Sequence, residues 1–261
     1  MPLAAKSKRV SATIWQSCGG ADCIQPIRGT LYRLVESQEQ VATMGYVDTL
    51  EEQALLEELL ENAKPQNLPE AKSYHYLLKT PFRYPPLQWG SRFGRIHEPG
   101  IFYGGASVEV LFAETAYYRF LFWDSMQAAA PKDYMRSEHS LFSAHYKTEQ
   151  GVRLQQAPFD QYTAELTHKQ NYSQTQKLGS DMRDAGVQAF EYQSSRSAVP
   201  LLCVGLFTPK AFSQKKPSNV SPWFCQLTEN EVTFKQKDGT QLVRHSREDF
   251  CVSGELPLPA A

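Results

Sequence analysis

The stretch GSRFGRIHEPGIFYGGASVEVLFAETAYYRFLF, residues 90–122, decides how the chain is interpreted. Ser107 follows a glycine pair and is a good helix N-cap, and Glu109 falls in the first turn, where the helix dipole favours a negative charge. We therefore predict a helix over residues 108–123. Apolar and aromatic residues recur three, four and seven positions from Glu114, which places this carboxylate on the apolar stripe of the helix.

A carboxylate on an apolar stripe loses hydration and needs partners. Glu114 is therefore either paired with an arginine such as Arg92 or directed into a cleft. Structural ion pairs perturb carboxylates as readily as active sites do, so the pattern alone leaves both interpretations open.

The flanking sequence predicts helices and strands in alternation. Asp48 begins a helix that Glu51 stabilises through a capping box, and its acidic residues mark a solvated side opposite Leu50, Leu55 and Leu59. The proline-rich residues 80–90 are expected to be extended or turned. The other expected helices cover residues 74–78 and 173–185, the latter ended by Gly186, and the expected strands cover 29–35, 101–103, 141–147, 187–192, 201–208 and a hairpin of 231–236 with 241–245.

Composition excludes several functional classes. The formal charge of −1, from 27 basic and 28 acidic residues, gives no general attraction to nucleic acid or anionic membranes. The apolar runs are too short to span a membrane, and the first residues lack a secretory signal, so we expect a cytoplasmic protein. Five scattered cysteines are expected to be free thiols, and no spacing indicates a metal site. A lone loop histidine, His97, is left out of the catalytic set.

Residues 90–122 resemble the core motif of the RES domain family, which is named for an arginine, a glutamate and a serine. Arg92 in GSRFG matches the family arginine, Tyr103 in GIFYGG its tyrosine, and Glu114 in LFAETAYYR its glutamate. The serine is matched by Ser194 in DAGVQAFEYQSSRS.

Two further segments carry the resemblance. Gln193 stands where the family usually has proline, which leaves Ser195 as an alternative serine, and Arg196 matches the arginine that follows. Upstream, Tyr32 and Arg33 in GTLYRLV resemble the pair that opens the domain.

The resemblance implies a fold similar to that of ADP-ribosyltransferase toxins. We expect an α+β protein, a compact single domain with a bent central sheet and surrounding helices. The catalytic domain is predicted over residues 27–209, with a helical insertion at about 48–78. An irregular arm over residues 1–26 precedes it, and a folded extension over 210–261, without an autoinhibitory tail, follows.

The resemblance also implies NAD as substrate, with no bound cofactor. Cleavage of the nicotinamide–ribose bond develops positive charge on the ribose, which the Glu114 carboxylate would stabilise. Arg92 and Arg33 would hold a pyrophosphate or an incoming phosphate, Tyr103 would stack on a ring, and Ser194 would orient the substrate. Hydrolysis and phosphorolysis both remain open.

The implied biological role is that of the toxin in a bacterial toxin–antitoxin pair. Its partner would be a helix-turn-helix antitoxin that covers the cleft and itself holds the DNA, and a homodimer within that complex is left open. Two alternatives remain: a mono-ADP-ribosyltransferase acting on a protein, and a non-catalytic binding module in which Arg92 and Glu114 form a structural pair.

Overall fold

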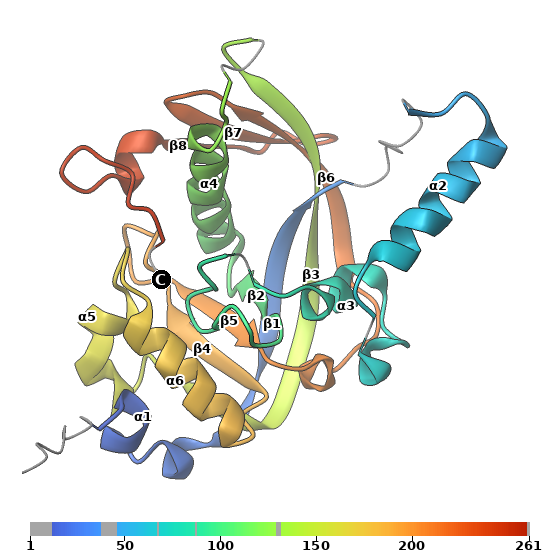
Figure 1. Ribbon diagram of the computed structural model, residues 1–261. Helices are drawn as coiled ribbons and strands as arrows, with labels where there is room; N and C mark the ends of the chain where they lie inside the picture. The colour runs from blue at the N-terminus through green and yellow to red at the C-terminus, as the bar shows by residue number, and fades with distance from the viewer. Residues whose placement is uncertain (1–11, 38–45, 67, 87, 129–131, 260–261) are drawn as a thin grey trace, which may run out of the picture.

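One long strand organises the molecule. The computed structural model describes residues 12–37, 46–66, 68–86, 88–128 and 132–259 (Figure 1). Strand β3 (Met135–Arg153) pairs along one edge with β1 (Gln25–Glu36). Its other edge pairs first with β6 (Ser218–Leu227) and, at its end, with β4 (Ala189–Gln193). Nineteen residues of extended chain thus serve three partners.

The described strands form one mixed sheet in the order β1-β2-β5-β4-β3-β6-β7-β8. Because β1 also pairs with β3, the first five strands in this order close on themselves, which bends the sheet strongly. Strands β6 to β8 extend from β3 as an antiparallel wing. The predicted α+β class is confirmed. The remaining strands are β2 (Phe102–Gly105), β5 (Leu202–Leu206), β7 (Glu231–Gln236) and β8 (Leu242–Ser246).

Helix α4 (Val108–Asp124) lies between the closed strands and the wing (Figure 1). It begins where predicted, because the Ser107 side chain accepts a hydrogen bond from the Val110 amide at 3.4 Å. Its buried residues include Phe112, which packs against Trp223 of β6 and Phe234 of β7. The wing therefore holds α4 in place from the side opposite the closed strands.

The first described residues are more regular than expected. Thr13 forms a capping box with Gln16, and Ile14 and Trp15 are buried against α6 (Ser173–Asp184). The expectation of an irregular arm is wrong for residues 13–26, because the packing of two apolar side chains against the core stabilises a one-turn helix. Residues 1–11 lie outside the described residues. This region contains α1 (Ile14–Ser17), a 3-10 helix (Gly20–Cys23) and the start of β1, and the short α5 (Thr163–Leu166) lies near α6.

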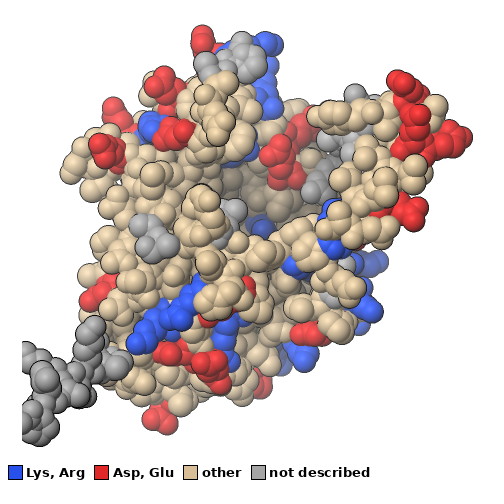
Figure 2. All heavy atoms as spheres, in the orientation of Figure 1, with Lys and Arg blue, Asp and Glu red and all other residues tan. Residues whose placement is uncertain are grey.

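Helix α2 (Leu50–Ala63) forms where predicted, but its N-cap is Thr49 rather than Asp48. Thr49 accepts the Glu52 amide at 3.1 Å, and the Asp48 amide donates to the Glu52 carboxylate at 2.9 Å, so the cap is displaced by one residue. The helix projects from the sheet and carries a cluster of acidic side chains (Figures 1 and 2). Both its acidic side and its leucines, Leu50, Leu55 and Leu59, are exposed.

Helix α3 (Tyr76–Arg83) corrects the expectation that residues 80–83 are extended, since it continues through Pro81. A proline inside a helix removes one backbone hydrogen bond. Packing compensates: Leu78 and Phe82 are buried, and the Phe82 ring lies 6.1 Å from that of Phe102 on β2. Tertiary contacts thus override the local signal.

The C-terminal hairpin of β7 and β8 is confirmed, whereas β6 was not predicted. Buried Trp223 and Cys225 alternate with more exposed neighbours along β6, but Pro222 obscures the strand pattern. None of the helices within the described ranges is long and apolar enough to cross a membrane.

Candidate active site

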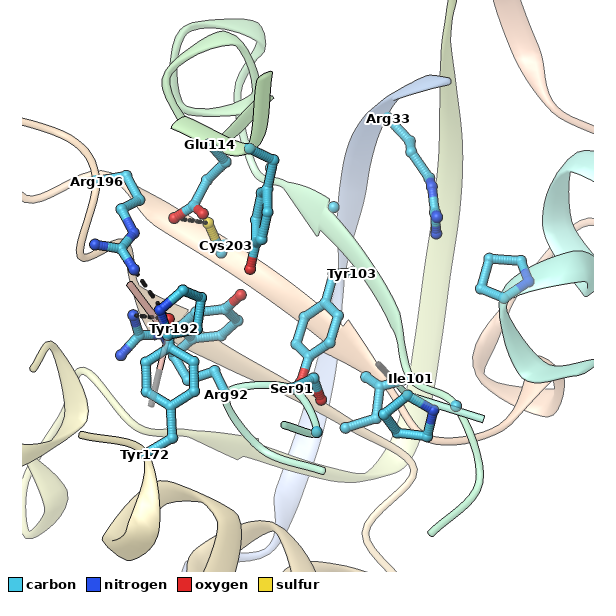
Figure 3. Close-up of a pocket in the computed structure, with 18 of the residues that line it drawn as sticks. Arg33, Ser91, Arg92, Ile101, Tyr103, Glu114, Tyr172, Tyr192, Arg196 and Cys203 are labelled. Carbon is cyan, nitrogen blue, oxygen red and sulfur yellow. Dashed lines mark hydrogen bonds between the residues drawn. The ribbon is translucent and has the colours of Figure 1, made fainter. Parts of the chain in front are cut away.

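A pocket of about 400 Å³ opens beside α4, over strands β2, β4 and β5. Among its lining residues are five that the sequence singled out. Figure 3 shows Glu114 extending from α4 towards Arg196 and Cys203, while Arg33 lies on β1 at the opposite side. The five predicted residues that line it are Arg33, Arg92, Tyr103, Glu114 and Arg196.

Glycines bring α4 close to the sheet at this pocket. Gly105 is the last residue of β2, and a Cβ there would meet the Val110 side chain at 2.7 Å and the Ser107 carbonyl at 2.8 Å. A side chain at residue 105 would therefore displace the first turn of α4. Because Glu114 lies two turns further on, this close approach helps to place its carboxylate against the strands.

The Glu114 carboxylate is half-buried and held by a serine hydroxyl. Ser194 Oγ donates to Glu114 Oε1 at 2.5 Å, and Ser194 Oγ itself accepts from the amides of Arg196 at 3.0 Å and Ser197 at 3.3 Å. The hydroxyl proton is thereby committed to the carboxylate. Ser194 is buried, and its role in this geometry is to fix Glu114.

Arg92 is buried, and both terminal nitrogens of its guanidinium donate hydrogen bonds to the protein. It donates to the carbonyls of Leu166 at 3.2 Å and His168 at 2.9 Å, to the Tyr172 hydroxyl at 3.4 Å, and to the Ser195 hydroxyl. The described residues contain no ion pair between Arg92 and Glu114, although the two are close enough for the carboxylate to matter. Burial opposes the charge on Arg92, but nearby Tyr172 and Glu114 raise its pKa overall.

Arg196 shares Tyr172 with Arg92. Its Nη2 donates to the Tyr172 hydroxyl at 2.9 Å and to the Lys169 carbonyl at 2.8 Å, and its Cζ lies 3.5 Å above the Tyr117 ring. Nη1 is buried without a hydrogen-bond partner among the described residues. Arg196 therefore keeps one terminal nitrogen unpaired among the described residues, whereas both terminal nitrogens of Arg92 are hydrogen-bonded.

The Tyr103 hydroxyl joins the site to the loop that carries Arg92. It accepts from the Phe93 amide at 3.1 Å and shares a hydrogen bond with Ser91 Oγ at 3.0 Å. Burial raises the pKa of Tyr103 to about 12, so the hydroxyl is neutral at physiological pH. The ring lies edge-on to Tyr192 with centroids 6.3 Å apart, and both rings line the pocket.

On the opposite side, Arg33 lies 4.6 Å above the Phe102 ring, with Nη1 buried and without a partner among the described residues. Burial lowers the pKa of Arg33 to about 10, which still leaves it charged at neutral pH. Its neighbour Tyr32 points to the other face of β1, as strand geometry requires, and packs against the α4 core rather than the pocket.

Sequence reasoning missed several lining residues. Tyr192 and Cys203 are cross-strand partners on β4 and β5. Burial raises the pKa of each side chain well above its ordinary value, so the Cys203 thiol is protonated. Tyr192 lies two residues before Ser194, and the alternation of β4 could have indicated it. No local pattern marked Tyr172 or Pro259, since both reach the pocket from distant segments.

The sequence indicated neither a catalytic role for His97 nor a metal site. His97 is exposed and does not line the pocket. The described part of the chain holds no group of three or more histidine, cysteine or acidic residues suited to a metal ion. The pocket instead combines three guanidinium groups with one carboxylate, which suits a mostly anionic ligand that has one cationic centre.

The family model described as RES domain matches residues 67–228, more than half of the 261 residues. No curated protein matches the chain. The matched range contains Arg92, Tyr103, Glu114 and Ser194. It excludes β1 with Arg33, and also β7, β8 and the segment that follows them.

Proposed function

Because this chain belongs to the RES domain family, we propose that it is an enzyme that consumes NAD by cleaving the bond between nicotinamide and ribose. The RES domain family is associated with NAD-acting enzymes in general. One observation carries the proposal: the Glu114 carboxylate enters an arginine-lined pocket while a buried serine hydroxyl holds it at 2.5 Å.

The chemistry requires a fixed negative charge more than an acid. Nicotinamide in NAD is a cationic pyridinium and leaves as a neutral amide, so the positive charge grows on the ribose. A carboxylate already oriented by Ser194 stabilises that charge without reorganising during the reaction. Its half-buried position strengthens the interaction relative to water.

The arginines divide into two kinds. Arg33 and Arg196 each have a buried Nη1 without a partner among the described residues, and we assign these two guanidinium groups to the pyrophosphate of NAD or an incoming phosphate. Both terminal nitrogens of Arg92 already donate to the protein, so in this proposal Arg92 positions Tyr172 and Ser195 rather than binding a phosphate. The rings of Tyr103 and Tyr192 provide flat walls for the nicotinamide.

The acceptor of the ADP-ribosyl group is water or inorganic phosphate in this proposal. An unrestrained enzyme of this kind would drain the cell of NAD, which agrees with a toxin restrained by a helix-turn-helix antitoxin. Arg92 and Glu114 form no ion pair among the described residues, which supports the catalytic role proposed for this carboxylate over a purely structural one.

The test is incubation of the purified protein with NAD, with and without phosphate, followed by chromatography of the products. We expect free nicotinamide together with ADP-ribose, or with its 1-phosphate when phosphate is present. ADP-ribose attached to a protein would favour the transferase alternative. If nicotinamide is not released under any of these conditions, the proposal is wrong.

A further inference from the structure

The chain returns to the pocket after the last strand. A 3-10 helix (Arg247–Phe250) follows β8, and a tight turn is then closed by paired backbone hydrogen bonds between Val252 and Glu255 of 2.8 and 3.1 Å. Gly254 adopts a φ of +85° in this turn, a conformation that glycine adopts readily. Figure 1 shows the chain beyond it running back towards α4. This part of the chain lies outside the range that matches the family model.

The residues Leu256–Pro259, called here the 256–259 segment, are anchored to α4. Leu256 is buried in the same core cluster as Tyr117 and Phe250. The Tyr117 hydroxyl donates a hydrogen bond to the Pro257 carbonyl, and burial raises the pKa of Tyr117, so this donor keeps its proton. Prolines at 257 and 259 restrict the backbone further. The segment is therefore held in one position rather than free to swing.

Its last described residue reaches the site. Pro259 lines the pocket, whereas its neighbour Leu258 is 60% exposed and does not. Two contacts of Tyr117 show which side of the pocket the segment closes. Arg196 Cζ lies 3.5 Å above the Tyr117 ring, and Tyr117 follows Glu114 by about one turn of α4. The segment thus borders the pocket on the side of Arg196, next to the carboxylate.

We propose that the 256–259 segment is a specificity-determining wall that limits the size of the acceptor able to reach the ribose carbon beside Glu114. This inference rests on the proposed function. In the reaction the acceptor oxygen bonds to the ribose C1′, the C1′–N bond breaks with its electron pair leaving on nicotinamide, and the acceptor proton is released to solvent. With Pro259 in place, small acceptors such as water are favoured over the side chain of a folded protein.

The first test does not depend on NAD. Cys203 lines the pocket, and because its buried, protonated thiol reacts slowly in every variant, its alkylation rates by a small and by a bulky maleimide are compared with the wild type at one alkaline pH to report how open the pocket is. Peptide mass spectrometry separates Cys203 from the other cysteines. The matched variants are Pro259→Gly, with Pro259→Ala as a milder second change, and Leu258→Ala as the control, each checked by thermal unfolding.

We expect both Pro259 variants to raise the alkylation rate of Cys203, several-fold for the bulky reagent and less for the small one. Leu258→Ala should react like the wild type. Equal alkylation rates of Cys203 in all four proteins would contradict the proposal that the 256–259 segment limits access to the pocket, whether or not the protein consumes NAD.

The second test uses turnover, with methanol and benzyl alcohol competing as acceptors. Removing bulk from an apolar wall typically changes discrimination by about 10-fold. We expect Pro259→Gly to raise the ratio of benzyl to methyl ADP-riboside by about that factor, and Leu258→Ala to leave it unchanged. If the wild type consumes NAD and the ratio does not move, the wall is wrong. If the wild type consumes no NAD, the proposed function is wrong, and the Cys203 rates still decide the wall.

Discussion

The two sides of the pocket differ in how firmly their charged groups are held. On the α4 side, the Glu114 carboxylate accepts a hydrogen bond from Ser194, and the Arg92 guanidinium donates four hydrogen bonds to the protein. The Arg196 guanidinium on the same side donates two, although its Nη1 has no partner among the described residues. On the β1 side, Arg33 contacts the Phe102 ring, and its Nη1 has no hydrogen-bond partner in the part of the chain that the structure describes. A group fixed before the substrate arrives suits transition-state stabilisation, while an unpaired donor suits binding.

The largest expected effect is in cells, where toxicity should depend entirely on the Glu114 carboxylate. Expression of the wild-type chain in bacteria should stop growth and deplete cellular NAD, whereas Glu114→Gln should be tolerated at equal expression. Co-expression with a cognate helix-turn-helix protein should restore growth. Normal growth with unchanged NAD in cells that accumulate the wild-type protein would contradict the toxin proposal.

Ser194→Ala should lower kcat by about 10- to 100-fold, the value of a hydrogen bond to a charged group. The carboxylate would then lose the donor that orients it, while the substrate-binding groups would remain. If KM changes little, Ser194 acts on the transition state rather than on substrate binding, which supports the difference between the two sides of the pocket. A variant that folds normally and turns over at the wild-type rate would show that Glu114 needs no fixing.

Arg33→Ala should act in the opposite way, raising KM for NAD by about 10-fold while kcat is retained. Arg33→Lys keeps the charge but loses the planar fork and should fall between the two. Steady-state kinetics on all three proteins provide the measurement. A fall in kcat without a change in KM would break the proposed division between the two sides.

Tyr172→Phe should have the smallest of the substantial effects, about a 2- to 5-fold rise in KM, because the two arginines lose a shared acceptor but keep their backbone partners. Comparing circular dichroism and thermal unfolding with the wild type separates this effect from misfolding. A loss as large as that of Ser194→Ala would place Tyr172 among the groups that act in the transition state.

Tyr103 provides a second, milder test of positioning. Tyr103→Phe removes the hydrogen bonds to Phe93 and Ser91 but keeps the ring, whereas Tyr103→Ala removes the ring as well as the hydrogen bonds. We expect the alanine variant to be clearly the more damaged in kcat/KM. Equal damage from the two changes would assign the function to the hydroxyl rather than the ring.

Local signals in the sequence predicted some elements well. Ser107 caps α4 as expected, Gly186 adopts a φ of +77° after α6, and the hairpin of β7 and β8 forms around Asp238 and Gly239. Each depends on residues close together in the chain. Elements that depend on distant partners were missed: β6 forms because β3 and β7 lie on either side of it, and α3 continues through Pro81 because Phe82 is buried.

The site divides in the same way. The helical spacing around Glu114 left open an ion pair with Arg92 or a position facing a cleft. In the described residues the carboxylate lines a pocket and forms no ion pair with Arg92. The spacing could not reveal which groups hold it. Tyr172 and Pro259 lie far from Glu114 in the sequence and reach the pocket only because the sheet closes and the 256–259 segment returns to α4. No local pattern could therefore identify them.

The most direct test of the account is the rate of nicotinamide release from NAD by purified wild type, Glu114→Gln and Glu109→Gln. Glu109 lies on the same helix but is exposed and outside the pocket, so it controls for the loss of a charge from α4. We predict that Glu114→Gln loses about 100-fold or more in kcat, as expected for a lost electrostatic stabiliser, while Glu109→Gln stays close to the wild type. A soluble, folded Glu114→Gln protein with near-normal turnover would contradict the account.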